Sequence, residues 1–187
     1  MRQIFTACAF LAVMMMSVQG AELGDDGLHK AAWMRDTFKD LSEDLAEANG
    51  ENKRLMVMIE QRGCIYCREM HEEVFPDKKI AAYIEANFFV IQINMFGDVE
   101  VTDFDGEVLP EKEMVRKWGA LFTPTILFFP PEVTRDTSAG RAAVATMPGA
   151  FGRHTTFNML NWVMEEGYLG EESFQRYHTR KFAEQGG

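Results

Sequence analysis

The sequence predicts an α/β domain with a central mixed sheet of about four strands and helices on both faces. Short apolar runs of strand length alternate along the chain with amphipathic segments at helical spacing. This alternation is typical of a sheet that is covered by helices on both sides. At 187 residues the chain is long enough for one such domain with a sizeable core.

The first half of the domain is predicted to begin with a helix, because apolar residues recur at three- and four-residue steps before Asn49-Gly50. A continuous apolar run then follows, typical of a strand buried on both faces. The next helical pattern ends at Pro76. The expected elements are an N-terminal helix over 28–48, a strand over 55–59, helices over 64–75 and 78–86, and a second strand over 88–93.

The second half is predicted to complete the sheet and to end in helices. Its expected elements are a loop or short hairpin over 94–110, a helical turn or two over 111–118, a strand over 125–129, a loop over 132–141, a strand over 142–147, and helices over 155–165 and 171–184, the last a C-terminal tail. The last two strands should pair antiparallel. No linker or repeat divides residues 22–187, so we expect one domain with its core at about 55–166.

The first residues have the pattern of an export signal. Arg2 precedes an apolar run from Ile4 to Met16, and short side chains follow up to Ala21. As a helix this run spans about 20 Å, less than the roughly 30 Å of a bilayer core. We therefore expect residues 1–21 to be a cleaved signal peptide, the mature protein to be periplasmic, and no membrane insertion after cleavage.

The composition restricts the partners. The formal net charge is −10, which argues against binding to nucleic acid or to an anionic bilayer. An apolar fraction of 47% with 26% charged residues is ordinary for a soluble globular protein. We expect a monomer without a cofactor.

Signal cleavage leaves two cysteines, Cys64 and Cys67, in the motif Cys-Ile-Tyr-Cys. A disulfide that closes so short a loop stabilises a fold very little, so the spacing favours redox chemistry. The motif lies between a predicted strand and a predicted helix, and a helix start lowers a cysteine pKa from about 8.5 to roughly 3.5–7.5. Cys64 should be the attacking thiolate and Cys67, one turn further on, the resolving thiol.

Two cysteines at this spacing also occur in haem and metal sites. A c-type haem site needs histidine directly after the second cysteine, where this chain has Arg68. A structural zinc site needs four ligands. A carrier for a soft ion such as copper(I), with Cys64, Cys67 and His71 as ligands, stays open as an alternative.

A proline stands at the head of the third apolar strand, in Phe122-Thr123-Pro124-Thr125, a position that strands tolerate. Together with the strand and the motif, it resembles the thioredoxin superfamily. More narrowly, three segments are similar to SoxW-type periplasmic thioredoxin-like proteins, and the likeness covers roughly 55–163. They are Glu-Gln-Arg-Gly-Cys-Ile-Tyr-Cys-Arg-Glu-Met over 60–70, Val-Glu-Val-Thr-Asp-Phe-Asp-Gly over 99–106, and 122–125.

The resemblance implies roles for particular residues. Cys64 would attack, Cys67 would resolve, and Pro124 would follow a cis peptide bond beside the attacking cysteine. Thr123 and Pro124, with Ile65 and Tyr66 of the motif, would bind the substrate polypeptide.

One departure concerns the proton acceptor for Cys67. Thioredoxins have a buried aspartate in the strand before the motif, where this chain has Met58. Glu60 is the candidate replacement, and a solvent-facing carboxylate is the alternative interpretation of the same residue.

The resemblance also indicates a direction of reaction. Only 94–122 separates the second strand from Thr123, too short for the helical insert of DsbA-type oxidants, and 22–50 is too short for an isomerase dimerisation domain. We therefore expect an exported reductase of protein disulfides, supplied with electrons by a membrane donor. Periplasmic sulfur oxidation and cytochrome maturation are both compatible roles.

Overall fold

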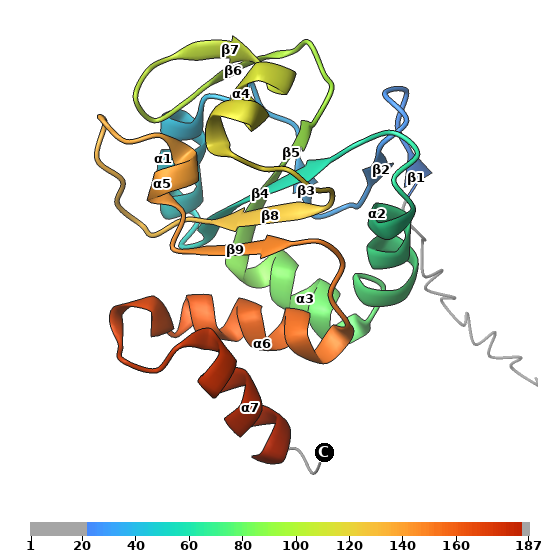
Figure 1. Cartoon of the computed structure of the whole chain (residues 1–187), viewed down its shortest axis with the longest axis vertical. Coiled ribbons are helices and arrows are strands. Elements are labelled where there is room, and N and C mark those ends of the chain that lie inside the picture. Colours follow the sequence, from blue (N-terminus) through green and yellow to red (C-terminus); the bar gives the residue numbers. More distant parts are fainter. Residues whose placement is uncertain (1–21, 185–187) are drawn as a thin grey trace, which may run out of the picture.

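A computed structural model describes residues 22–184, and these contain a five-stranded mixed sheet with the order β3-β5-β4-β8-β9 (Figure 1). β3, β5 and β4 run parallel, whereas β8 is antiparallel to β4 and β9 antiparallel to β8. The strands are β1 (Glu22–Leu23), β2 (His29–Lys30), β3 (Met34–Arg35), β4 (Arg54–Glu60), β5 (Phe88–Asn94), β6 (Glu100–Thr102), β7 (Val108–Pro110), β8 (Thr125–Phe128) and β9 (Ala145–Pro148).

Helices cover both faces of this sheet, as the sequence predicts (Figure 1). α1 and α4 pack on one face, and α3 and α6 pack on the other, where α7 adds an outer layer against α6. The helices are α1 (Leu41–Gly50), α2 (Ile65–Glu69), the π-helix η1 (Met70–Val74), α3 (Lys78–Asn87), α4 (Glu111–Trp118), α5 (Ala139–Ala142), α6 (Arg153–Met164), the short 3₁₀ helix η2 (Gly167–Leu169) and α7 (Phe174–Glu184). No helix within residues 22–184 is long and apolar enough to span a bilayer.

The central strand β4 shows why the chain forms two cores. Successive side chains of a strand point to opposite faces. Leu55, Val57 and Ile59 accordingly pack with α1 and α4, whereas Met56 and Met58 pack with η1, α3 and α6. Burial on both sides explains the uninterrupted apolar run in the sequence.

The predicted N-terminal helix over 28–48 is wrong in its first half. α1 begins only at Leu41, where the carboxylate of Asp40 accepts hydrogen bonds from the backbone N–H groups of Ser42 (2.9 Å) and Glu43 (3.1 Å). An aspartate that caps a helix in this way marks the first turn of the helix, so α1 begins here although the apolar spacing continues on both sides of Asp40. The preceding residues form the antiparallel hairpin β1–β2 and the edge strand β3, so the sheet has five strands rather than about four.

The remaining elements follow the sequence with smaller differences. The stretch 94–110 contains the hairpin β6–β7, and the strand predicted over 142–147 is β9, antiparallel to β8 as expected. The loop predicted over 132–141 runs into the short helix α5. The predicted signal peptide over 1–21 lies outside the described residues.

Candidate active site

The cysteine motif lies where β4 gives way to α2. After β4 the chain turns at Gly63, whose φ of 72° is a conformation that favours glycine, and Cys64 then caps α2. Cys64 and Cys67 form a disulfide with a Cα–Cα distance of 5.2 Å. α2 continues directly into the π-helix η1, so residues 65–74 form one helical segment behind the motif.

Two hydrogen-bond donors point at the sulfur of Cys64. The backbone N–H of Cys67 lies 3.0 Å from Cys64 Sγ, and the hydroxyl of Thr123 lies 3.3 Å from the same atom. Donors aimed at a sulfur stabilise its thiolate form once the disulfide is reduced. Cys64 is 8% exposed and Cys67 only 1% exposed, so the first sulfur is the one nearer to solvent.

The Thr123–Pro124 segment lies beside Cys64, as the Thr123 hydrogen bond requires. The peptide bond between Thr123 and Pro124 is cis, and β8 begins at the next residue. This places the segment at the end of the sheet where β4 leads into the cysteine motif, since Ile59 pairs with Thr125.

A cleft of about 670 Å³ adjoins the motif and the Thr123–Pro124 segment. Tyr66 is 55% exposed and Phe122 is 64% exposed, and their neighbours Ile65 and Leu121 are exposed as well. Large apolar side chains gathered on a surface mark a site of interaction. The cleft is lined by Gln61, Tyr66, Glu69, Met95, Leu121, Phe122, Thr123, Pro148, Gly149 and Ala150.

Glu60, the candidate proton acceptor, is buried with 1% exposure, so the solvent-facing interpretation of this carboxylate is wrong. Its Oε1 lies 3.0 Å from Nε2 of His71, which is also 1% exposed and belongs to η1. Its Oε2 accepts a hydrogen bond of 2.5 Å from the side-chain amide of Gln92 in β5. Buried polar groups need hydrogen-bond partners, and Glu60 has one on each oxygen.

Sequence reasoning missed several members of this polar group. Gln92 interrupts the apolar strand β5, and this interruption was the signal that could have identified it. His29 of β2 stacks on His71, and Lys30 of β2 donates a hydrogen bond to Gln92. No local sequence pattern reveals either contact. Met58 is fully buried in the apolar core. Its thioether side chain cannot take part in acid–base chemistry.

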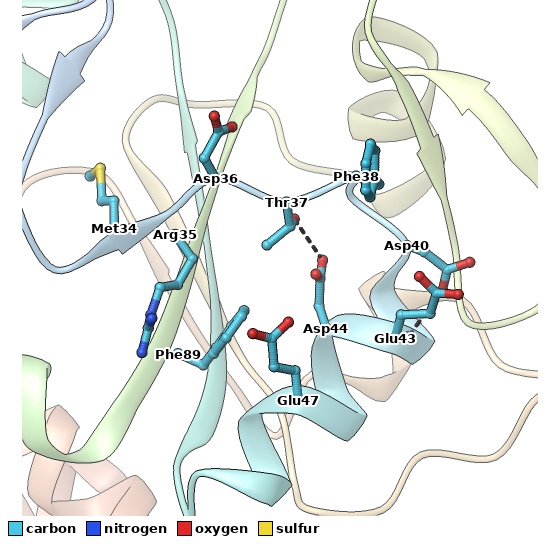
Figure 2. A pocket seen from close by; sticks show the side chains of 10 residues that line it. All are labelled: Met34, Arg35, Asp36, Thr37, Phe38, Asp40, Glu43, Asp44, Glu47 and Phe89. Carbon is cyan, nitrogen blue, oxygen red and sulfur yellow. Dashed lines mark hydrogen bonds between the residues drawn. The ribbon is translucent and has the colours of Figure 1, made fainter.

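A second pocket, of about 590 Å³, lies between α1 and the segment before it and shares no lining residue with the cleft. Figure 2 shows the carboxyl of Asp44 directed at Thr37, whose hydroxyl donates a hydrogen bond of 3.3 Å to it. Burial, together with the nearby carboxylates of Asp40, Glu47 and Glu43, raises the pKa of Asp44 to about 7. No cysteine or histidine lines this pocket.

Metal ligation receives no support from the described geometry. Across residues 22–184 no group of three or more His, Cys, Asp or Glu side chains is arranged to hold a metal ion. His71, the third ligand of the carrier hypothesis, directs Nε2 at Glu60.

The fold and the paired cysteines define this molecule as a thioredoxin-fold protein with a disulfide-forming CxxC site. The chain belongs to the thioredoxin-like domain family, whose model matches residues 41–136. The CxxC pair within this family supports thiol–disulfide oxidoreductase chemistry.

Solved structures agree with this fold. A thioredoxin-fold protein from Helicobacter pylori is 16% identical with a TM-score of 0.54, covering 71% of this chain and 86% of that chain. A thioredoxin from Thermus thermophilus is 24% identical with a TM-score of 0.52, covering 68% of this chain and 86% of that chain. At these identities the likeness concerns the fold alone. A comparison with curated protein sequences finds no match.

Proposed function

We propose that this protein is an exported thiol–disulfide oxidoreductase that reduces disulfides in polypeptide substrates. The observation that carries the proposal is the sulfur of Cys64, which accepts two hydrogen bonds beside an apolar cleft. A stabilised thiolate next to a surface suited to a polypeptide is what disulfide exchange with a protein requires.

The first step is attack by the Cys64 thiolate on one sulfur of a substrate disulfide. The bond between Cys64 and that sulfur forms, the substrate disulfide breaks, and the other substrate sulfur leaves as a thiolate. Ile65, Tyr66 and Phe122 would hold the apolar side chains that flank the substrate cysteine, and the backbone of Thr123 and Pro124 would align its chain.

The second step releases the substrate. The thiol of Cys67 gives up its proton and attacks Cys64 Sγ, the Cys64–Cys67 disulfide forms, and the remaining substrate sulfur leaves as a thiolate. Two electrons have then passed from the cysteine pair to the substrate, and the disulfide seen in the structure is the product state. A dithiol donor at the membrane would return the pair to its reduced form by the reverse exchange.

The proton of Cys67 needs a buried acceptor, and we assign this role to Glu60. The carboxylate lies at the end of β4, four residues before Cys64, and is bonded to His71, four residues after Cys67 in the same helical segment. Glu60 and Cys67 are each only 1% exposed, so the carboxylate and the thiol are both shielded from bulk water.

The proposed direction of electron transfer and the proposed periplasmic location rest on the sequence and on the size of the domain. Between β5 and Thr123 the chain forms only β6, β7 and α4, so it contains no large helical insert of the kind found in DsbA-type oxidants. The predicted signal peptide supports a periplasmic location, and the SoxW-like segments favour a partner in periplasmic sulfur oxidation, with cytochrome maturation as the other role.

A trapping experiment tests this proposal. Cys67→Ser, expressed with its export signal, should accumulate covalent complexes with its substrates because the resolving thiol is missing. Cys64→Ser is the matched control and should accumulate few, since the attacking thiolate is gone. Non-reducing gels and mass spectrometry would identify the partners. If neither variant traps a protein and both lose bound copper, the carrier alternative replaces the redox proposal.

A further inference from the structure

The hairpin β1–β2 lies outside the part of the chain that the family model matches, yet it contacts the region behind the cysteine motif. Figure 1 shows the hairpin beside α2. The hairpin is anchored by Leu28, which is 2% exposed. Its turn at Gly27 lies against the loop before Cys64, since a Cβ at Gly27 would lie 2.5 Å from Nε of Arg62.

Gln92 connects the hairpin to Glu60. Lys30 Nζ donates a hydrogen bond of 2.6 Å to Gln92 Oε1, and the backbone carbonyl of His29 accepts one of 2.8 Å from Gln92 Nε2. The same amide nitrogen donates to Glu60 Oε2 at 2.5 Å. Both N–H groups of the amide and its oxygen are therefore in use, and two of the three partners belong to β2.

These bonds fix which end of the amide faces Glu60. A lysine ammonium can only donate, so it requires the oxygen of Gln92, and the nitrogen must then face the carboxylate. Without Lys30 and the His29 carbonyl, the amide could turn its oxygen toward Glu60, where two acceptors would repel each other. Asp26 holds Lys30 in place with an ion pair of 2.8 Å.

The hairpin also holds the second partner of Glu60. The ring of His29 stacks on the ring of His71 with centroids 5.0 Å apart and an interplanar angle of 21°. The ring of Phe75 packs edge-on against the ring of His71, with centroids 5.1 Å apart. Among the described residues, His71 Nδ1 is buried without a hydrogen-bond partner, so packing rather than a second hydrogen bond sets the ring orientation.

We propose that the hairpin β1–β2 is part of the redox site, where His29 and Lys30 act as positioning residues for Glu60 through His71 and Gln92. This inference rests on the proposed function, because Glu60 acts on the proton of Cys67. Loss of the hairpin contacts should slow the resolving step and leave the first attack by Cys64 unchanged.

The two steps can be separated in one stopped-flow experiment. The reduced full-length mature protein is mixed with dithiobis(nitrobenzoic acid), and each step releases one coloured nitrobenzoate thiolate. The first phase depends on reagent concentration and reports attack by Cys64. The second phase is first-order and reports resolution by Cys67.

Three hairpin variants and one control carry the test. Lys30→Met keeps the aliphatic stem but removes the ammonium, and His29→Ala removes the stacked ring. Both variants should slow the second phase by about tenfold, because a misplaced proton acceptor loses part of its rate enhancement. The rate of the first phase should stay within about twofold of wild type. His29→Phe keeps a ring against His71 and should restore the rate, and Glu22→Gln, on the exposed strand β1, should match wild type. Circular dichroism confirms folding of each variant.

Each outcome separates this inference from the proposed function. If the wild type releases only one nitrobenzoate thiolate per protein, the redox proposal fails. If Glu60→Gln resolves as fast as wild type, Glu60 is not the acceptor and the hairpin role fails with it. If Glu60→Gln is slow while Lys30→Met and His29→Ala both match wild type, only the role of the hairpin is overturned.

Discussion

Replacing Asp44 with asparagine should stabilise the protein at neutral and alkaline pH. Asp44 lies in α1 with 3% exposure, and its one hydrogen bond comes from Thr37. Burial and three neighbouring carboxylates raise its pKa to about 7 (Figure 2). The amide oxygen of asparagine can accept the same hydrogen bond without a charge.

The sign follows from the order in which the two states lose the proton. In the unfolded chain Asp44 ionises near its ordinary pKa of 3.8, whereas in the folded protein it keeps its proton up to about pH 7. Ionisation therefore favours unfolding, and its cost grows from about pH 4 to pH 7 and then stays constant. The difference between the folded and unfolded pKa of Asp44, at about 1.4 kcal/mol per pH unit, sets an upper limit of about 4 kcal/mol on the free energy of unfolding that the charge removes. Because Asp44 lines a pocket that is open to solvent, the charge is partly screened, and we expect roughly 2 kcal/mol.

Urea unfolding of wild type and Asp44→Asn at several pH values measures this effect. The variant should gain roughly 2 kcal/mol at pH 8, and most of this gain should be lost near pH 4, where Asp44 is protonated in the folded protein and only about half ionised in the unfolded chain. Glu43→Gln is the control, because Glu43 is exposed in the first turn of the same helix and should change the stability by less than about 0.5 kcal/mol. A gain for Asp44→Asn that is equal at pH 4 and pH 8 would refute the reasoning.

Three further predictions concern the cysteine pair and a buried ion pair. In the reduced protein Cys64 should alkylate faster than Cys67 at neutral pH, because its sulfur is more exposed and accepts two hydrogen bonds; equal rates would contradict the assigned roles. Thr123→Val keeps the shape but removes one donor, and should slow alkylation of Cys64 several-fold, with Thr123→Ser restoring the rate. Lys117→Met should cost roughly 2 kcal/mol in urea unfolding, because Lys117 Nζ lies 2.9 Å from the buried carboxylate of Asp103; an unchanged midpoint would show that the pair contributes nothing.

The sequence was sufficient for the parts of the fold that depend on regular patterns. The apolar run over 55–59 predicted β4, and the alternate burial of its side chains in two cores confirms a strand covered on both faces. Pro76 marked the end of a helix because proline breaks the hydrogen-bonding pattern of helices. The position of Cys64 at a helix start followed from the same reasoning.

The prediction for the N-terminal region was wrong for a physical reason. β1, β2 and β3 have two residues each, too few for an alternating pattern, so the helix predicted over 28–48 extended over β2 and β3. Their stability comes from distant partners instead. Lys30 bonds to Gln92, and Met34 pairs with Val90, contacts between residues more than fifty positions apart that a single sequence does not reveal.

The carboxylate that we propose as proton acceptor and the hairpin are linked by the position of Glu60 on β4. On β4, Met58 and Glu60 are two residues apart and so share the face that η1 covers. A carboxylate at position 60 rather than at position 58 lies at the end of β4, where the sheet alone would leave it near solvent. His71, Gln92 and the hairpin enclose it there and supply a partner for each oxygen. A chain with Met58 and Glu60 therefore needs a cover at this end of the sheet, and β1–β2 provides it.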